Sequence, residues 1–467
     1  MADVVIVGAG PAGLSAALDA AEAGHDCTLV EVQTSVGGMA GSFELAGQRV
    51  DYGSHRLHRA ISPRLLERFQ TLLGEDLQVR PRNGRIRLRG RWVGFPLRAG
   101  NLVANLPPSF GLRVAADLAT GPLRRRRDTS FESDIRVRLG PTVAREFYNP
   151  YALKLYGVEA AALDAELAHR RVSASSGMDI VRRVVRAARP VGRQFLYPRH
   201  GYGQLSEALA EAAVRAGVDV RLNTAVTGIG LDADRAIVSI QSPSAPRTAD
   251  TLGANAVFST VPVSVLASVI RPPPPGEVME ALARCRTRAM VLVYLVVRRD
   301  QYTPFDAHYF PDSSSRVARL SESKNYRDGD DPRGQTVLCA EIACWPYDDL
   351  WRCNDDRLAE IVSDDLERAG LPPVDPSMTA VKRLRSVYPV FESATTADRA
   401  RVSAWLQSLA VGGLMSFGRQ GLAVLDNLHH VLDMGSAAVT ALTGTGMVNE
   451  DAWKSSLDAF LTHVVED

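Results

Sequence analysis

The sequence contains few of the features that mark secreted, membrane-spanning or nucleic-acid-binding proteins. Its five cysteines include no Cys-x-x-Cys pair, so we expect reduced thiols, no disulfide framework and no metal site. No apolar run approaches the roughly 18 residues that a membrane helix needs; the longest, 289–297, predicts a buried strand. With 54 basic and 53 acidic residues, the net charge of +1 argues against nucleic-acid binding through bulk charge.

The first residues carry no pattern of an export signal. Asp3 stands where a signal peptide has positive charge, and Gly8, Gly10 and Pro11 interrupt the apolar stretch that follows. We therefore expect a cytoplasmic protein without an integral membrane segment. The length of 467 residues allows about three domains of roughly 150 residues, and the hydrophobic content of 46% is ordinary for a globular chain.

The N-terminal residues match a dinucleotide-binding pattern. A strand is expected at 3–7 and a helix at 14–23, with glycines between them in Gly-x-Gly-x-x-Gly spacing. A second strand at 27–31 ends in Glu31, whose carboxylate can accept hydrogen bonds from both ribose hydroxyls. The glycines permit a tight turn, close approach of a pyrophosphate and close helix packing. Strand, glycines, helix, strand and acid together predict a dinucleotide site.

The residues beyond Glu31 favour FAD over NAD. A second glycine pair, Gly37 and Gly38, follows the acid directly, where NAD-binding units usually continue into a helix. A strand pair across 217–227 is typical of a chain that returns to cover an adenine. An apolar strand at 410–418, followed by an Ala-rich helix from about residue 433, adds a third piece. Three separated pieces therefore build one nucleotide domain.

The fold class that follows is α/β, with a Rossmann-type FAD-binding domain of the glutathione-reductase-like type and an inserted mixed α+β substrate domain. The FAD-binding domain takes residues 1–75, 195–270 and 405–467, and the substrate domain takes 76–194 and 271–404. Within the substrate domain the patterns predict an alternating strand or a hairpin at 85–93, strands at 289–297 and 336–344, and an amphipathic helix near 355–369.

With these pieces placed, the chain resembles the superfamily of FAD-dependent amine oxidases and protoporphyrinogen oxidases, which also holds phytoene-desaturase-like enzymes and UDP-galactopyranose mutase. The resemblance spans nearly the whole chain. Residues 51–58 are similar to the Asp-x-Gly-x-His-x-x-His segment of the mutase-like branch, in which the first histidine lies beside the flavin ring. Residues 197–205 are similar to its Tyr-Pro-x-x-Gly-x-Gly-x-Leu stretch, and 417–430 to the C-terminal flavin segment.

The resemblance implies two catalytic residues, His55 and Arg419. His55 would tune the flavin ring or move a proton, and Arg419 would place a fixed cation near the flavin. The structural alternatives are a histidine that only holds its loop and a strand-end ion pair. The predicted cofactor-binding residues are Gly8, Gly10, Pro11, Ala12, Gly13, Glu31, Val32, Gly37, Gly38, Met39, Gly53, Ser54, His55, Val226, Gly418, Arg419, Asp426, Asn427 and His429.

The chain also departs from the mutase pattern. By alignment, two acids of the mutase fall on Asn427 and His429, and a substrate tyrosine falls on Leu425. These departures speak against the mutase reaction itself. An aromatic cage for amines is not evident either, and Tyr388 and Trp405 are the nearest candidates for one.

A basic stretch runs from Arg80 to Arg127, with 12 arginines and a single acid. Three interpretations remain open: a funnel for an anionic substrate, an attachment face for acidic lipid or a partner, or a solvated helix end. Arg170, Arg171 and Arg193 could also contact an anionic substrate. Nucleic acid is the least favoured partner, because stacking aromatics are sparse there.

Three functional hypotheses follow. The first is an FAD-dependent oxidoreductase that oxidises a C–N or C–C single bond of a small, biosynthetic substrate by hydride transfer to flavin. Since the sequence shows no second nucleotide-binding unit that could hold a nicotinamide, dioxygen or a separate acceptor is expected to reoxidise the flavin. The second is a redox-neutral, mutase-like enzyme that acts on a nucleotide sugar through reduced flavin. The third is a non-catalytic, prenyl-binding escort protein. The arginine and alanine bias favours a bacterial origin.

Overall fold

The computed structural model of the chain describes residues 3–97, 99–172, 194–232, 235–242 and 249–465. Within these residues no helix is long and apolar enough to cross a membrane. Residues 173–193, which include Arg193, form the end of the first predicted segment of the substrate domain and lie outside the described residues.

The nucleotide-binding part is built on a parallel sheet of five strands. In spatial order these are β20 (Leu414–Ser416), β13 (Ala256–Ser259), β1 (Asp3–Val7), β2 (Asp26–Val30) and β9 (Asp219–Arg221). Because side chains alternate along a strand, Val4 and Ile6 face one layer and Val5 and Val7 the other. Both sets are buried, which explains why β1 reads as a continuous apolar run.

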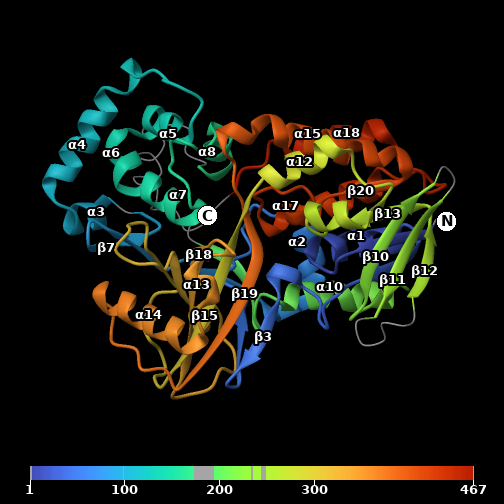
Figure 1. The fold of residues 1–467 in the computed structure, drawn as a ribbon. Coiled ribbons are helices and arrows are strands. Elements are labelled where there is room, and N and C mark those ends of the chain that lie inside the picture. Colours follow the sequence, from blue (N-terminus) through green and yellow to red (C-terminus); the bar gives the residue numbers. More distant parts are fainter. Residues whose placement is uncertain (1–2, 98, 173–193, 233–234, 243–248, 466–467) are drawn as a thin grey trace.

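Each face of this sheet is covered by a different layer. On the face of Val4 and Ile6 lie three helices, α1 (Pro11–Glu22), α10 (Gln204–Arg215) and α17 (Leu428–Thr440). The other face packs on a four-stranded sheet formed by β12 (Ala249–Ala254), β11 (Ala236–Gln241), β10 (Ala225–Leu231) and β14 (Ile270–Arg271). The helices α11 (Val263–Val269), α12 (Gly276–Arg284) and α15 (Thr396–Ser408) complete this layer, as Figure 1 shows.

A second, seven-stranded sheet carries the other half of the molecule (Figure 1). Its order is β19 (Met378–Pro389), β15 (Thr287–Val297), β18 (Thr336–Cys344), β17 (Arg319–Glu322), β16 (Ala307–Tyr309), β6 (Gly84–Leu88) and β7 (Arg91–Phe95). Along β15, Val291 and Val293 pack with α14 (Asp355–Arg368), whereas Met290 and Leu292 face the nucleotide-binding part. The strand is therefore buried on both sides.

A group of helices closes one end of this sheet, at the upper left of Figure 1. It comprises α3 (Ala99–Asn105), α4 (Pro108–Ala119), α5 (Phe131–Leu139), α7 (Asn149–Tyr156) and α8 (Ala165–Arg171). The shorter elements near the site are β3 (Ser42–Leu45), β4 (Gln48–Asp51), α2 (Pro63–Leu73), β5 (Leu77–Pro81), β8 (Gln194–Pro198) and α18 (Glu450–Phe460). Ile135, Leu167 and Phe391 belong to the core that these helices share with the end of β19.

The α/β fold class is confirmed, and so are the hairpin of β6 and β7, the strands β15 and β18, and helix α14. The prediction of a long strand at 410–418 is wrong. A 3-10 turn occupies Leu409–Gly412 and Gly413 adopts a φ of 78°, so that only β20 is extended. Helix α17 starts at Leu428, earlier than predicted, because Asn427 caps its amides. The division into two domains stays a prediction.

Burial of His308 in β16 has a consequence for stability. The ring is 1% exposed, and burial, followed by the nearby charge of Arg85, lowers its pKa to about 3. An unfolded chain protonates this histidine near pH 6.5, whereas the folded chain does not. We expect stability to be level above pH 6.5 and to fall as the pH drops toward 3, by up to about 1.4 kcal/mol per pH unit.

Urea unfolding at several pH values between 7.5 and 4 measures this effect. In His308→Gln, the fall in the free energy of unfolding below pH 6.5 should be smaller by the contribution of one proton. In His169→Gln, at an exposed site, the fall should match that of the wild type. Identical slopes for His308→Gln and the wild type would contradict the assignment.

Candidate functional site

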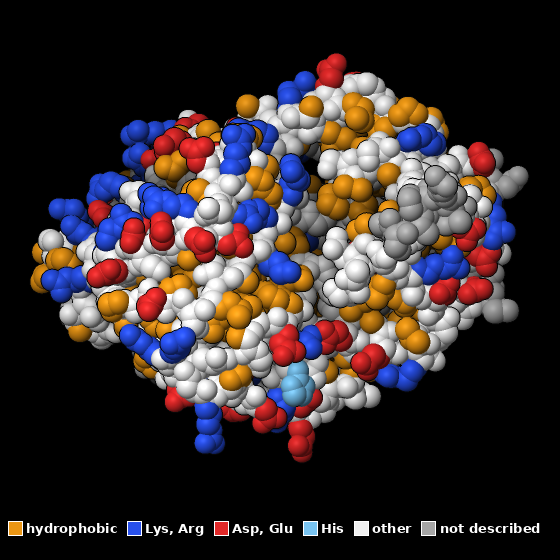
Figure 2. Space-filling model, turned by 60° about the horizontal axis from the view of Figure 1, so that its bottom comes forward, with side chains coloured by type: hydrophobic (Ala, Val, Ile, Leu, Met, Phe, Trp, Pro, Cys, Tyr) orange, Lys and Arg blue, Asp and Glu red, His pale blue; other side chains and the backbone are white. Residues whose placement is uncertain are grey.

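A large cavity lies between the parallel sheet and the seven-stranded sheet, with a volume of about 2440 Å³. Pockets for drug-sized ligands measure about 300–1,000 Å³. The cavity therefore has room for a dinucleotide and a substrate together. In Figure 2 the surface is hollowed near the centre of the face shown, and Lys or Arg side chains lie at the edge of the hollow.

The glycine turn after β1 forms one end of the cavity. A Cβ on Gly13 would lie 2.0 Å from the Gly8 main-chain oxygen, so only glycine lets α1 begin this close to the strand. Gly8 itself has a φ of 106°. A Cβ on Gly10, by contrast, would meet no protein atom within 4 Å, although Gly10 lines the cavity. The space beside Gly10 is thus open to a ligand at the N-terminus of a helix, a position that suits a pyrophosphate.

Glu31 directly follows β2, and its carboxylate links the turn after β1 to the loop after β2. Its Oε2 accepts a hydrogen bond from the Ala9 amide and its Oε1 one from the Gln33 amide, both at 2.8 Å. A carboxylate has about four acceptor positions, so each oxygen keeps a lone pair for a ribose hydroxyl. The carboxylate both fixes the loop and remains available to a nucleotide.

The second glycine pair packs against the first. The Gly37 amide donates to the Ala9 main-chain oxygen at 2.8 Å, with Gly37 at a φ of 108°. A Cβ on Gly38 would lie 3.4 Å from the Gly10 Cα. Gly37 therefore supports the loop, while Gly38 and the following Met39 line the cavity.

His55 lies in the loop after β4, on the wall of the cavity. Its ring stacks on Tyr202, with centroids 5.0 Å apart and planes 17° from parallel. Nε2 lies 2.9 Å from the Tyr52 main-chain oxygen; since that oxygen can only accept, Nε2 carries the proton and Nδ1 a lone pair. Burial lowers the pKa of His55, so the ring is neutral at pH 7.

A buried ion pair supports the same loop, and sequence reasoning missed it. Glu341 of β18 accepts a hydrogen bond from the Ser54 amide at 2.7 Å. Its two oxygens also bind Arg319 Nε and Nη2, each at 2.9 Å. Burial lowers the pKa of Arg319, but the Glu341 carboxylate outweighs it and holds the guanidinium charged. Both residues line the cavity next to Gly53 and Ser54.

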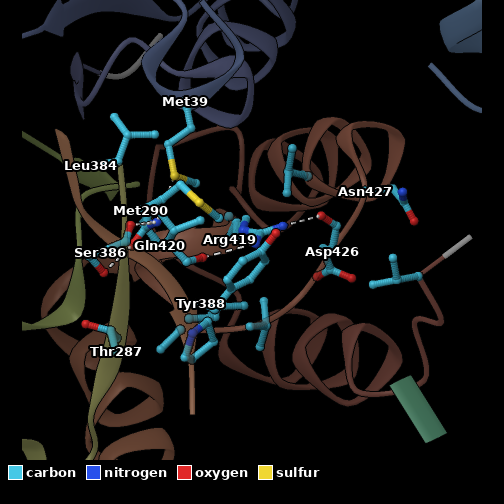
Figure 3. A pocket seen from close by; sticks show the side chains of 18 of the residues that line it. Met39, Thr287, Met290, Leu384, Ser386, Tyr388, Arg419, Gln420, Asp426 and Asn427 are labelled. Atoms are coloured by element: carbon cyan, nitrogen blue, oxygen red, sulfur yellow. Dashed lines mark hydrogen bonds between the residues drawn. The ribbon is translucent and has the colours of Figure 1, made fainter. Parts of the chain in front are cut away.

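Arg419 enters the cavity from α16 (Gly418–Gly421), the short helix after β20 (Figure 3). Nη1 donates to the Asp426 main-chain oxygen at 3.2 Å, and Nη2 to that of Val387 at 3.0 Å. The guanidinium carbon lies 5.4 Å from the centre of the Tyr388 ring. Burial lowers the pKa of Arg419. In the described part of the chain no carboxylate pairs with Arg419 within 4.0 Å, so the predicted strand-end ion pair is not formed there.

Comparison with known proteins decides the family. Residues 11–422 match the flavin-containing amine oxidoreductases. The chain belongs to this family. Membership confirms the resemblance stated from the motifs, the FAD cofactor and, at the level of the family, a flavin-dependent oxidoreductase.

Individual relatives add detail on the fold. The phytoene dehydrogenase of Streptomyces griseus is 30% identical over 264 residues, which are 50% of each chain. The L-amino-acid oxidase of Notechis scutatus scutatus is 45% identical over 80 residues, 16% of this chain and 15% of the oxidase. The chain thus matches half, or less, of the length of these curated relatives. A structure of reduced UDP-galactopyranose mutase covers 100% of both chains, with a TM-score of 0.80 and 21% identity. A putrescine oxidase bound to putrescine covers 94% of this chain and 98% of its own, with a TM-score of 0.64 and 17% identity.

Most residues assigned to the cofactor from the sequence meet in this one cavity. Those that line it are Gly8, Gly10, Pro11, Ala12, Glu31, Val32, Gly38, Met39, Gly53, Ser54, His55, Gly418, Arg419, Asp426 and Asn427. Four do not line it. Gly13 and Gly37 lie beneath the loops that do, His429 is buried in the first turn of α17, and Val226 pairs with Ile240 in the four-stranded sheet.

Five of the twelve arginines in the basic stretch from Arg80 to Arg127 form ion pairs. Its ion pairs are Arg80–Asp328, Arg87–Asp312, Arg89–Glu146, Arg124–Asp117 and Arg126–Asp134. Of its described members, Arg82 lines the cavity. Arg170 and Arg171 line it as well, so the cations that line the cavity come mainly from other segments. Trp405 is buried under the nucleotide-binding sheet, whereas Tyr388 reaches the cavity.

Proposed function

We propose that the chain oxidises a C–N or C–C single bond of a small anionic molecule, with FAD as the electron acceptor. The observation that supports this best is the continuity of one cavity, which runs from the glycine turn to a wall of cationic and aromatic side chains. Bound flavin supplies the two-electron chemistry, and dioxygen or a separate acceptor takes the electrons afterwards.

The chain's own groups would bind the substrate and move its proton. Arg419 has no carboxylate partner among the described residues, and Arg171 lines the same cavity. Cations in a water-poor site attract an anionic group strongly. The neutral His55, whose Nδ1 carries a lone pair, could accept the proton that leaves with the hydride.

A redox-neutral, mutase-like reaction on a nucleotide sugar is the second candidate. The cationic lining of the cavity favours it, because such a substrate carries a diphosphate. Against it, Leu425 stands at the position of the substrate tyrosine and lies in the core of the helical group. Stoichiometry separates the two, since a mutase works only after flavin reduction and yields no oxidised product.

The first experiment is the visible spectrum of the purified protein before and after dithionite, and again after air is admitted. A flavin spectrum that returns within seconds supports an oxidase and justifies a screen of anionic amines and alkane-type substrates. Slow reoxidation shifts the choice to a dehydrogenase or to the mutase-like reaction, tested with nucleotide sugars on the reduced protein. If the protein takes up no flavin even on reconstitution, the proposal is wrong and the escort-protein hypothesis replaces it.

The role of His55 is tested by His55→Phe. The phenyl ring preserves stacking on Tyr202 but removes the proton acceptor, so flavin content should stay normal. The rate of flavin reduction by the substrate found in the screen should fall by about 10²–10⁴. His200→Phe, at an exposed site, serves as the control. An unchanged rate in His55→Phe would assign His55 to holding the loop.

A further inference from the structure

Four of the nine histidines of the chain gather around Asp426, on the far side of Arg419. The rings of His429 and His430 are 4.1 Å apart, those of His430 and His463 are 4.3 Å apart and stacked, and His58 lies 6.2 Å from His429. Asp426 precedes α17, and His463 follows α18. The catalytic proposal above uses none of these imidazoles.

The Asp426 carboxylate is buried, and its nearest polar neighbours are two imidazoles. Its side chain is 0% exposed, and among the described residues no donor makes a hydrogen bond to Oδ1 or Oδ2. The bond from Arg419 goes to the main-chain oxygen instead, which Figure 3 shows with the carboxylate beyond it. A buried carboxylate requires a positive partner, because loss of hydration is costly.

The neighbouring imidazoles favour the charged carboxylate: burial raises the pKa of Asp426, but His430 and His463 outweigh it and lower the pKa. His430 Nδ1 lies 3.1 Å from Asp426 Oδ1 but accepts a hydrogen bond from the Asn427 amide at 3.3 Å, so this nitrogen carries a lone pair and no proton. His463 Nδ1 lies 3.3 Å from the same oxygen and also makes no hydrogen bond to it. Two imidazole nitrogens and a carboxylate oxygen, all potential metal ligands, therefore face one another across a short distance, an arrangement that a cation between them stabilises.

We propose that Asp426, His430 and His463 bind a divalent transition-metal ion, with Zn²⁺ the ion that best suits the donors. One carboxylate oxygen and two imidazole nitrogens form a donor set that zinc takes in proteins. Ligands at about 2.0–2.2 Å in a tetrahedron lie about 3.3–3.6 Å from one another. The 3.1 and 3.3 Å separations from Asp426 Oδ1 are close to this, and all three donor atoms lie within 4.8 Å of one another.

The ion would fasten three parts of the chain together. Asp426 lies at the loop that Arg419 binds, His430 in the first turn of α17, and His463 in the segment after α18. Two residues later, the Val465 amide donates to the Arg170 main-chain oxygen on α8 at 2.7 Å. The site thus holds the crossing from the nucleotide-binding part to the helical group. This proposal is independent of the substrate and departs from the expectation of no metal, which rested on cysteine spacing alone.

The test uses the flavin-loaded protein, stripped with a chelator and titrated with Zn²⁺ by calorimetry. We expect one zinc per chain and a Tm that rises with zinc concentration. Loading with Co²⁺ instead should give visible bands at wavelengths beyond the flavin absorption, as expected for a site of nitrogen and oxygen ligands. Absence of stoichiometric binding of either ion to the wild-type protein would overturn the proposal and leave a bridging water in its place.

Variants locate the site. His463 lies outside any helix. His463→Gln should weaken zinc binding by at least about 10-fold, because removing a residue that only hydrogen-bonds to a metal ligand already lowers the affinity that much. Asp426→Asn should do the same, with circular dichroism as the check that the protein is folded, because Asp426 also lines the cavity. His200→Gln, an exposed histidine beside Asp76, should bind zinc like the wild type. Equal zinc affinity in His463→Gln and the wild type would contradict the assignment, whatever the behaviour of Asp426→Asn.

Discussion

Replacing Gly10 with alanine is expected to abolish flavin binding while the protein remains folded. Gly10 has a φ of −73°, which alanine adopts readily, and a Cβ there meets no protein atom within 4 Å. The methyl group would instead occupy the space in which the cofactor pyrophosphate approaches the helix N-terminus. We expect the affinity for FAD to fall by at least about 100-fold, or about 2.7 kcal/mol, in a titration of the apoprotein.

Two further glycines provide the controls. Gly276→Ala also adds a methyl group in open space, but at the start of α12 and away from the cavity, so it should leave both FAD affinity and Tm unchanged. Gly13→Ala should lower Tm, because its Cβ would collide with the Gly8 main-chain oxygen at 2.0 Å. Normal flavin content in Gly10→Ala would place the pyrophosphate elsewhere in the cavity.

Replacing Arg419 with methionine is expected to lower the reduction potential of the bound flavin. Reduction adds negative charge to the ring, and a nearby cation without a carboxylate partner stabilises that charge. A hydrogen bond to a charged group contributes about 1.5–3 kcal/mol. At about 30 mV for each 1.4 kcal/mol, the potential should fall by about 30–60 mV in a dye-equilibration titration.

The matched control for this experiment is Arg286→Met. Arg286 also lines the cavity, but it pairs with Glu392 at 2.8 Å, so its charge is already compensated. Its loss should move the potential much less. An unchanged potential in Arg419→Met, with flavin still bound, would separate Arg419 from the flavin ring and leave it the role of joining Val387 of β19 to the Asp426 loop.

Local patterns were sufficient to predict the cofactor end of the site. Gly8, Gly13 and Glu31 are constrained by contacts with residues close to them along the chain or on the neighbouring strand, and such constraints are written in short motifs. The apolar run at 289–297 likewise predicted a strand, because β15 is covered on both faces. The strand at 410–418 was overestimated, since Gly413 turns the chain just before β20.

The substrate side could not be predicted in the same way. Glu341 binds the amide of Ser54, which lies 287 positions earlier, and no periodicity in either segment indicates that they meet. The approach of His463 to Asp426 is equally invisible, because it depends on how α17 and α18 pack. Such residues are identified only once the sheets and helices have been assembled in three dimensions.

The irregular pairing of β15 with β19 also bears on how this cavity could change during evolution. Arg288 pairs with Tyr388 and Met290 with Leu384, so the extra residues lie in β19, while Thr287, Met290 and Leu292 of β15 reach the cavity wall. The residues between them, such as Val291, belong to the core beneath α14. One strand therefore carries two independent sets of positions. Mutations at Met290 or Leu292 change the lining of the cavity and also disturb a buried core, whereas the second set contributes to folding alone.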